Sequence, residues 1–105
     1  MYCYAVHLVM RIASFRHKGL KRLYETGNRR GVRADLAGKL TVIIHAIDQA
    51  RSVEQAAKYP GWKLHPLKGG RRGGWSIWVT GNYRLTFRVE DDDVHDVDLE
   101  DYHGK

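Results

Sequence analysis

The sequence predicts an α+β fold in which helices come first and an antiparallel sheet follows. Apolar residues recur at helical spacing before Pro60 and alternate with polar residues after it. The length of 105 residues allows one hydrophobic core and is too short for two independent ones. We therefore expect residues 1–105 to form a single domain.

One strand and two helices are predicted in the first half of the chain. Residues 10–15 (MRIASF) are short and half apolar, which favours a strand. Residues 17–26 carry apolar side chains at helical spacing, and Gly27 ends this helix. After the basic loop at 28–31, a longer helix has one apolar stripe that should face the core, formed by Leu36, Leu40, Ile43, Ile44 and Ile47.

A short third helical turn is predicted at Val53–Lys58. Ser52 and Gln55 have the spacing of a capping box, in which each side chain satisfies a backbone N–H of the first turn. Pro60 then stops the helix.

Three strands should follow. Residues 75–79 and 83–89 each alternate apolar with polar side chains, and Gly81-Asn82 joins them as a tight hairpin. The last strand, from residue 94 to about 102, has Val97 and Leu99 on one face and acids on the other. One face of the sheet should therefore pack on the helices and the other should be polar.

Charge is distributed unevenly along the chain. Residues 1–89 carry 17 lysines and arginines and four acids, whereas residues 90–101 carry eight acids and no base. The basic part should attract phosphate polymers or an acidic protein, but a surface kept basic only for solubility is an alternative. The outward acids Asp96, Asp98 and Glu100 should pair with arginines of the neighbouring strand, each exposed pair contributing at most about 1 kcal/mol.

Composition also bears on the compartment and on cofactors. A single cysteine, Cys3, excludes an internal disulfide and a cysteine-rich zinc site, which fits a reducing cytoplasm. The apolar start has no preceding basic region and meets Arg11 too soon for a signal peptide or a membrane span. The six histidines show no close ligand spacing. We therefore expect a cytoplasmic protein with no metal, no cofactor and no membrane partner.

Three polar stretches lie on or beside the predicted strands: KLHPLK at 63–68, NYR at 82–84 and DYH at 101–103. Each has a purely structural interpretation. A histidine before proline can begin a turn, a loop lysine can be merely solvated, Arg84 can pair with an acid of the last strand, and Tyr102 can cover the edge of the core.

Together, these side chains suit metal-free cleavage of RNA. That reaction needs a base for the ribose 2′-hydroxyl proton, cations for the charge on the phosphorane, and an acid for the leaving 5′-oxygen. His65 and His103 are suited to proton transfer, and Lys68 and Arg84 to the phosphate charge. Tyr102 could stack on an unpaired base or orient a proton relay.

The loop Gly69–Gly74 (GGRRGG) is less informative. It lacks the Gly-Lys-Ser/Thr ending and the following helix of a phosphate-binding P-loop, and it joins two strands. We interpret it as a hairpin tip whose Arg71 and Arg72 can reach a nucleic-acid backbone, or equally as a plain mobile loop.

Four motifs in order, SFRHKGLKRLYETG, KLHPLKG, GGWSIWVTGNYRLTF and EDYH, resemble the HigB branch of the RelE/ParE toxins of type II toxin–antitoxin systems. The resemblance covers nearly everything from Met10 to His103. It implies a compact RelE-like fold with an N-terminal strand, two main helices and a curved antiparallel sheet of three to four strands. It also implies a ribosome-dependent endoribonuclease, an mRNA interferase that cuts messenger RNA in the A site and so inhibits translation.

The same resemblance implies partners and residue roles. The partners are a HigA-like helix-turn-helix antitoxin and mRNA on the ribosome, with operator DNA contacted only through the antitoxin. His65 and His103 become the leading proton-transfer residues, Lys68 and Arg84 the phosphate or transition-state cations, and Asp101 and Tyr102 orienting groups. Which histidine is the base stays open.

The chain departs from the family pattern mainly at its ends. Met10 stands where such toxins usually begin, so residues 1–9 look like an extension, and Gly104-Lys105 run past the usual terminal histidine. Two alternative functions also remain. A ParE-like gyrase inhibitor shares the fold, but that branch is not expected to carry the HxxK and DYH residues. An inactive member that only binds antitoxin or RNA would keep them.

Overall fold

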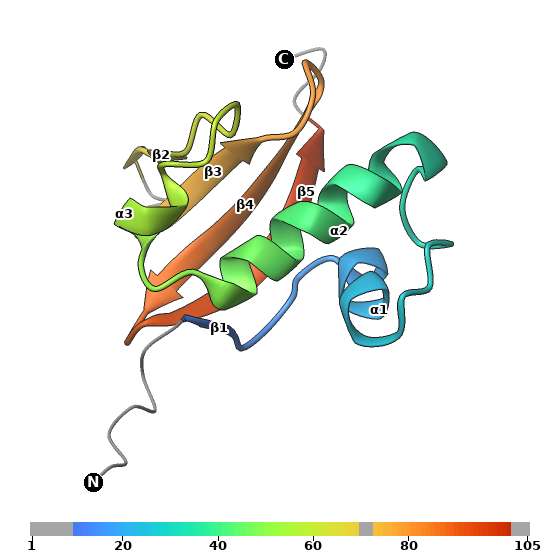
Figure 1. Cartoon of the computed structure of the whole chain (residues 1–105), viewed down its shortest axis with the longest axis horizontal. Coiled ribbons are helices and arrows are strands. Elements are labelled where there is room, and N and C mark those ends of the chain that lie inside the picture. Colours follow the sequence, from blue (N-terminus) through green and yellow to red (C-terminus); the bar gives the residue numbers. More distant parts are fainter. Residues whose placement is uncertain (1–9, 70–72, 102–105) are drawn as a thin grey trace, which may run out of the picture.

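The computed structural model describes residues 10–69 and 73–101, which form three helices beside a five-stranded sheet (Figure 1). The helices are α1 (Lys18–Thr26), α2 (Ala34–Gln49) and α3 (Val53–Ala56). The strands are β1 (Arg11–Ile12), β2 (His65–Pro66), β3 (Gly74–Trp78), β4 (Tyr83–Glu90) and β5 (Asp93–Asp101). The predicted α+β class is confirmed.

Local signals set the ends of α1. The His17 side chain caps the N-terminus of the helix, because its Nδ1 accepts a hydrogen bond from the Leu20 N–H at 3.1 Å. Gly27 ends it in the left-handed conformation, with φ of +76° and a backbone N–H bonded to the Leu23 carbonyl. Both the helix and its glycine stop are as predicted.

The predicted apolar stripe of α2 is the centre of the core. Its five side chains are each at most 3% exposed. They pack on apolar side chains from one face of the sheet, across which α2 lies (Figure 1). The sheet and the residue that follows β3 contribute Ile77, Val79, Leu85, Phe87, Val94 and Val97 to this core.

Helix α3 is shorter than predicted. It ends at Ala56, because the residues after it make tight i to i+3 hydrogen bonds, from Lys58 N–H to the Gln55 carbonyl and from Tyr59 N–H to the Ala56 carbonyl. The capping box is also modified. Ser52 Oγ accepts from the Gln55 N–H as expected, but the Gln55 side chain accepts from the Arg51 N–H at 2.6 Å.

The sheet has five strands and is mixed. Its strand order is β1-β5-β4-β3-β2, and β1 pairs with β5 in parallel, with Arg11 opposite Asp93 and Ile12 opposite Val94. The antiparallel strands β2 to β5 agree with the predicted antiparallel sheet of three to four strands, but no residue range was predicted for β2, which pairs with β3. β2 has only two residues, which is too short to show an alternating pattern in the sequence.

The predicted charge pairing between the last two strands is confirmed in part. Arg84 of β4 lies 3.1 Å from Glu100 of β5, and Arg88 lies 3.3 Å from Asp96. The other Glu100 oxygen accepts from the Thr86 hydroxyl at 2.9 Å. The acidic strand is therefore held against the arginines of its neighbour.

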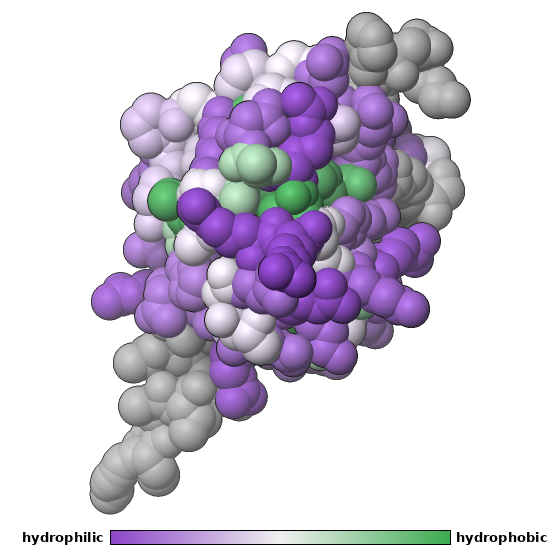
Figure 2. All heavy atoms as spheres, turned by 90° about the vertical axis from the view of Figure 1, so that its right-hand side faces the viewer, coloured by the Kyte–Doolittle hydropathy of each residue, from purple (hydrophilic) through white to green (hydrophobic). Residues whose placement is uncertain are grey.

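The α1 side of the molecule is polar. Figure 2 views the right-hand side of Figure 1, where α1 and the start of α2 lie, and most of that surface is hydrophilic. Helix α1 exposes Lys18, Lys21 and Arg22 to solvent. Within residues 10–69 and 73–101, no helix is long and apolar enough to cross a membrane.

Candidate active site

A pocket of about 300 Å³ brings together three of the predicted site residues. His65 and Lys68 line it from β2 and the segment that follows, and Arg84 lines it from β4. Pro66 and Leu67 complete the lining. Because β3 lies between β2 and β4, the sheet rather than the sequence makes these residues neighbours.

The surroundings of His65 define which ring nitrogen is available. Its Nδ1 lies 2.9 Å from the Lys63 carbonyl oxygen. A carbonyl can only accept, so Nδ1 must carry the hydrogen and Nε2 of the neutral ring is left with a lone pair. Lys63 has a left-handed backbone, with φ of +50°, and its carbonyl faces the ring. The His65 side chain is exposed, and its contact with the Lys63 carbonyl fixes the orientation of the ring. A proton acceptor requires both properties.

Arg84 is held in place by the last strand. Its side chain is 24% exposed, and its guanidinium pairs with Glu100, to which the Thr86 hydroxyl also donates. The sequence left two interpretations of Arg84, an ion pair with the last strand and a cation of the site. The structure contains the ion pair and also places Arg84 in the pocket lining.

The remaining predicted residues lie at the margins of the described chain. Asp101 is exposed at the end of β5, one position beyond Glu100 and opposite Tyr83. Tyr102 and His103 lie outside the described residues, as do Arg71 and Arg72. Strand pairing does place the end of β5 beside the part of β4 that carries Arg84.

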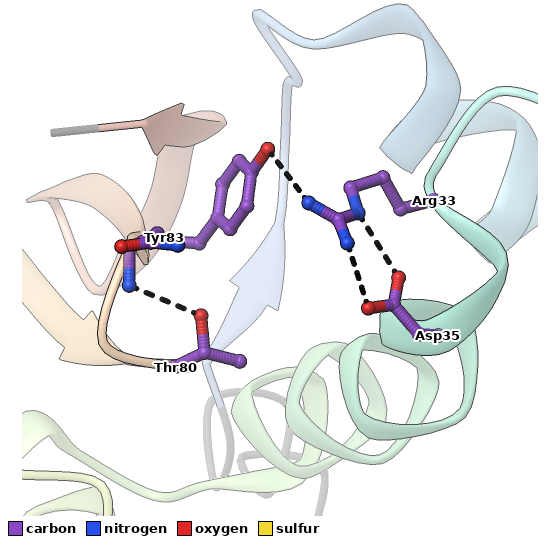
Figure 3. Close-up of polar contacts among 5 residues, drawn as sticks. Arg33, Asp35, Thr80 and Tyr83 are labelled. Carbon is purple, nitrogen blue, oxygen red and sulfur yellow. Dashed lines mark hydrogen bonds and ion pairs between the residues drawn. The ribbon is translucent and has the colours of Figure 1, made fainter. Parts of the chain in front are cut away.

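A contact that sequence reasoning missed secures this end of β4. Arg33, just before α2, donates to both Asp35 oxygens at 3.0 and 2.9 Å and to the Tyr83 hydroxyl at 3.4 Å (Figure 3). Hydrogen bonds to Tyr83 and then to Asp35 raise the pKa of the Arg33 guanidinium. Tyr83 is the register partner of Asp101, so this contact stabilises the strand beside the predicted DYH motif.

Other histidines have structural positions. His17 begins α1, and the exposed His45 of α2 has its Nδ1 2.9 Å from the Thr41 carbonyl oxygen. In the part of the chain that the structure describes, no three His, Cys, Asp or Glu side chains gather as a metal site would require.

Comparison with known proteins gives consistent matches. A family model described as "RelE-like toxin of type II toxin-antitoxin system HigB" matches residues 13–103. Endoribonuclease HigB of Proteus vulgaris is 44% identical over 92 residues, which cover 88% of this chain and 99% of that protein.

Two solved structures share the fold. A YafQ mutant from E. coli aligns with a TM-score of 0.57 at 16% identity and covers 89% of this chain and 93% of that one. The YoeB–YefM complex from Staphylococcus aureus contains a chain that aligns with a TM-score of 0.51 at 17% identity, covering 89% and 98%. At such identities the likeness concerns the fold alone.

Proposed function

The chain belongs to the HigB-like family of RelE-like toxins of type II toxin–antitoxin systems, and we propose that it is an endoribonuclease that cleaves mRNA in the ribosomal A site and so arrests translation. Its 44% identity to an endoribonuclease, over almost the whole of that protein, supports the enzymatic activity. One observation in the structure carries the assignment: the pocket that joins His65, Lys68 and Arg84 from separate elements.

The proposed reaction uses the RNA's own 2′-hydroxyl as the nucleophile. His65 Nε2 takes the proton from this hydroxyl, because Nδ1 is occupied as a donor to the Lys63 carbonyl. The 2′-oxygen then attacks the adjacent phosphorus, the bond to the 5′-oxygen breaks, and a 2′,3′-cyclic phosphate is left on one fragment. The leaving 5′-oxygen takes a proton, for which we propose His103 as the donor.

Two cations stabilise the transition state in this scheme. The phosphorane carries an additional negative charge, and Lys68 and Arg84 line the pocket in which it forms. The Glu100 carboxylate orients the Arg84 guanidinium and offsets part of its charge. Asp101 and Tyr102 are proposed to orient the terminal histidine, and Arg71 and Arg72 to contact the RNA backbone.

The proposal extends to the partners. As a type II toxin the protein has an antitoxin partner. We propose that this partner is a HigA-like helix-turn-helix protein, that operator DNA is contacted only through it, and that the toxin acts in the cytoplasm. We also propose that the chain is a single toxin domain and that residues 1–9 are an extension of it.

Mapping of 5′ ends in cellular transcripts after brief induction tests the function. The parent should produce cuts in reading-frame register. His65→Ala should lose cleavage by roughly 10²-fold or more, because a positioned base contributes about that much. His45→Ala is the matched control, since it removes an exposed histidine outside the pocket lining, and it should cleave like the parent.

Two results would contradict the assignment. If His65→Ala cut at the parental rate, His65 would not be the base. Intact transcripts together with broken DNA would instead favour the gyrase-inhibitor alternative.

A further inference from the structure

Trp78, the last residue of β3, lies beside the pocket with two ammonium groups against its ring. Lys39 Nζ of α2 is 4.6 Å from the ring centroid, and Lys63 Nζ is 5.2 Å from it. Trp78 is the register partner of Arg84. Directly opposed residues of an antiparallel pair project from the same face, so the indole shares a face with an arginine of the pocket. We call Lys39, Lys63 and Trp78 the Trp78 cluster.

The charges of the Trp78 cluster differ from those around it. Arg33, Arg84 and Arg88 each have a carboxylate within ion-pair distance. Among residues 10–69 and 73–101, neither Lys39 nor Lys63 has one. Two cations that share one ring repel each other, and an anion placed between them would remove that repulsion.

The backbone positions both lysines. Lys39 Nζ donates to the Val79 carbonyl, which holds its ammonium group at the end of β3 and leaves two of its three N–H donors for a ligand. Lys63 is the residue whose carbonyl orients the His65 ring. The Trp78 cluster is therefore joined to the pocket through Lys63 on one side and through the Trp78–Arg84 pair on the other.

We propose that the Trp78 cluster binds the phosphate backbone of the substrate RNA next to the cleaved bond. Lys39 and Lys63 neutralise phosphates of the single strand that runs out of the pocket, and the half-buried indole holds both ammonium groups beside that strand. This proposal rests on the proposed function, since it concerns the same substrate, but it assigns a separate group of residues to binding rather than to cleavage.

Equilibrium binding of RNA to the protein, measured without ribosomes, tests this proposal. The probe is a fluorescent single-stranded RNA oligonucleotide with 2′-O-methyl groups, which cannot be cleaved, measured by anisotropy over a range of salt concentrations. Each phosphate contact on a single strand contributes roughly 0.7 to the slope of log K against log salt. The Lys39→Ala/Lys63→Ala variant should therefore lower the magnitude of this slope by about 1.4.

Matched variants exclude a general effect of charge or of folding. Lys18→Ala/Lys21→Ala removes the same charge from the exposed side of α1 and should keep the parental slope. Lys39→Arg/Lys63→Arg keeps both charges and should restore the parental slope. The proposal is overturned if the alanine variant keeps the parental slope, or if its loss is not rescued by arginine.

Failure of the proposed function can be distinguished from failure of this RNA-binding proposal. If the parent makes no cuts in cells but the lysine variants change the slope as expected, the protein is not the proposed endoribonuclease, but the Trp78 cluster does bind RNA. If the alanine variant binds the oligonucleotide like the parent but no longer sediments with ribosomes, the cluster contacts ribosomal RNA and this proposal is wrong.

Discussion

Asp48 shows how much one side chain can contribute to this fold. It belongs to α2, its Oδ1 accepts from the Ile12 N–H of β1 at 3.1 Å, and its Oδ2 accepts from the Tyr24 hydroxyl of α1 at 2.8 Å. Asp48→Ala leaves both half-buried donors without this acceptor, which should lower the free energy of unfolding by roughly 1–3 kcal/mol. Denaturant titration measures this. Asp48→Asn keeps one acceptor oxygen and should lose less, and equal losses would contradict this account.

Tyr24 predicts a dependence of stability on alkaline pH. Burial, the hydrogen bond to Asp48 and the Asp48 charge raise its pKa to about 12, above its ordinary value of 10.0. The fold therefore favours the neutral phenol. This stabilisation is fully present below pH 10 and is lost as the pH rises through about 12.

Tyr24→Phe isolates the effect, because phenylalanine does not titrate. The difference in unfolding free energy between parent and variant should be constant up to pH 10 and should shrink between pH 10 and about 12. Denaturant titration at each pH gives this difference. A difference that does not change with pH would show that Tyr24 titrates as it does in the unfolded chain.

At the scale of elements, a pair of glycines sets how closely α1 approaches the loop before α2. A Cβ built on Gly19 would lie 2.1 Å from the Gly31 carbonyl oxygen, and one on Gly31 would lie 2.5 Å from Gly19 Cα. Both obstacles are backbone, so they cannot move aside as a side chain would. Only glycine at both positions allows this approach.

Gly19→Ala should therefore destabilise the protein by roughly 1–3 kcal/mol, the usual cost of overpacking. Gly38→Ala is the matched control in the exposed middle of α2, where the nearest atom is 3.5 Å away on the flexible Arg29 side chain. It should stabilise by about 0.5–1 kcal/mol, because alanine favours helix. Thermal unfolding compares the two, and a stabilised Gly19→Ala variant would show that α1 and the loop can separate at little cost.

At the scale of the whole molecule, three consecutive exposed acids, Glu90, Asp91 and Asp92, lie at the turn between β4 and β5. Arg84 and Arg88 pair with acids of β5, and the hydrogen bond from Arg88 lowers the pKa of Glu90. Asp91 and Asp92 are exposed in the turn between β4 and β5. Because its net charge is +6, the molecule should attract RNA overall and repel it near this turn.

This acidic turn predicts how RNA association responds to salt. Asp91→Asn/Asp92→Asn removes two negative charges and should raise the association rate with single-stranded RNA at low ionic strength. At about 1 M salt, where the Debye length is about 3 Å, the rates of variant and parent should converge. Stopped-flow fluorescence measures both rates, and a rate difference that persists at high salt would indicate a local contact instead of steering.

The sequence by itself determined the features that short stretches of chain encode. Helix α1 with its glycine stop, the buried stripe of α2 and the β3–β4 hairpin follow from local periodicity and turn residues, because hydrogen bonds over a few positions set them. The sequence also identified the residue types needed for RNA cleavage, since the chemistry of a side chain does not depend on the fold. His103 and Tyr102 remain predictions of this kind.

Tertiary structure decided what depends on residues far apart in the chain. The sequence does not show that β1 pairs in parallel with β5, and β2 is too short to show an alternating pattern of apolar residues. Both short strands form because a longer neighbouring strand provides backbone hydrogen-bond partners. Pairing of β2 with β3 and of β3 with β4 brings His65, Lys68 and Arg84 to one pocket. The tertiary fold also places Lys39 of α2 and Lys63 against the Trp78 ring. Proximity across a sheet is a property of register, which packing of the core selects and no single stretch of sequence contains.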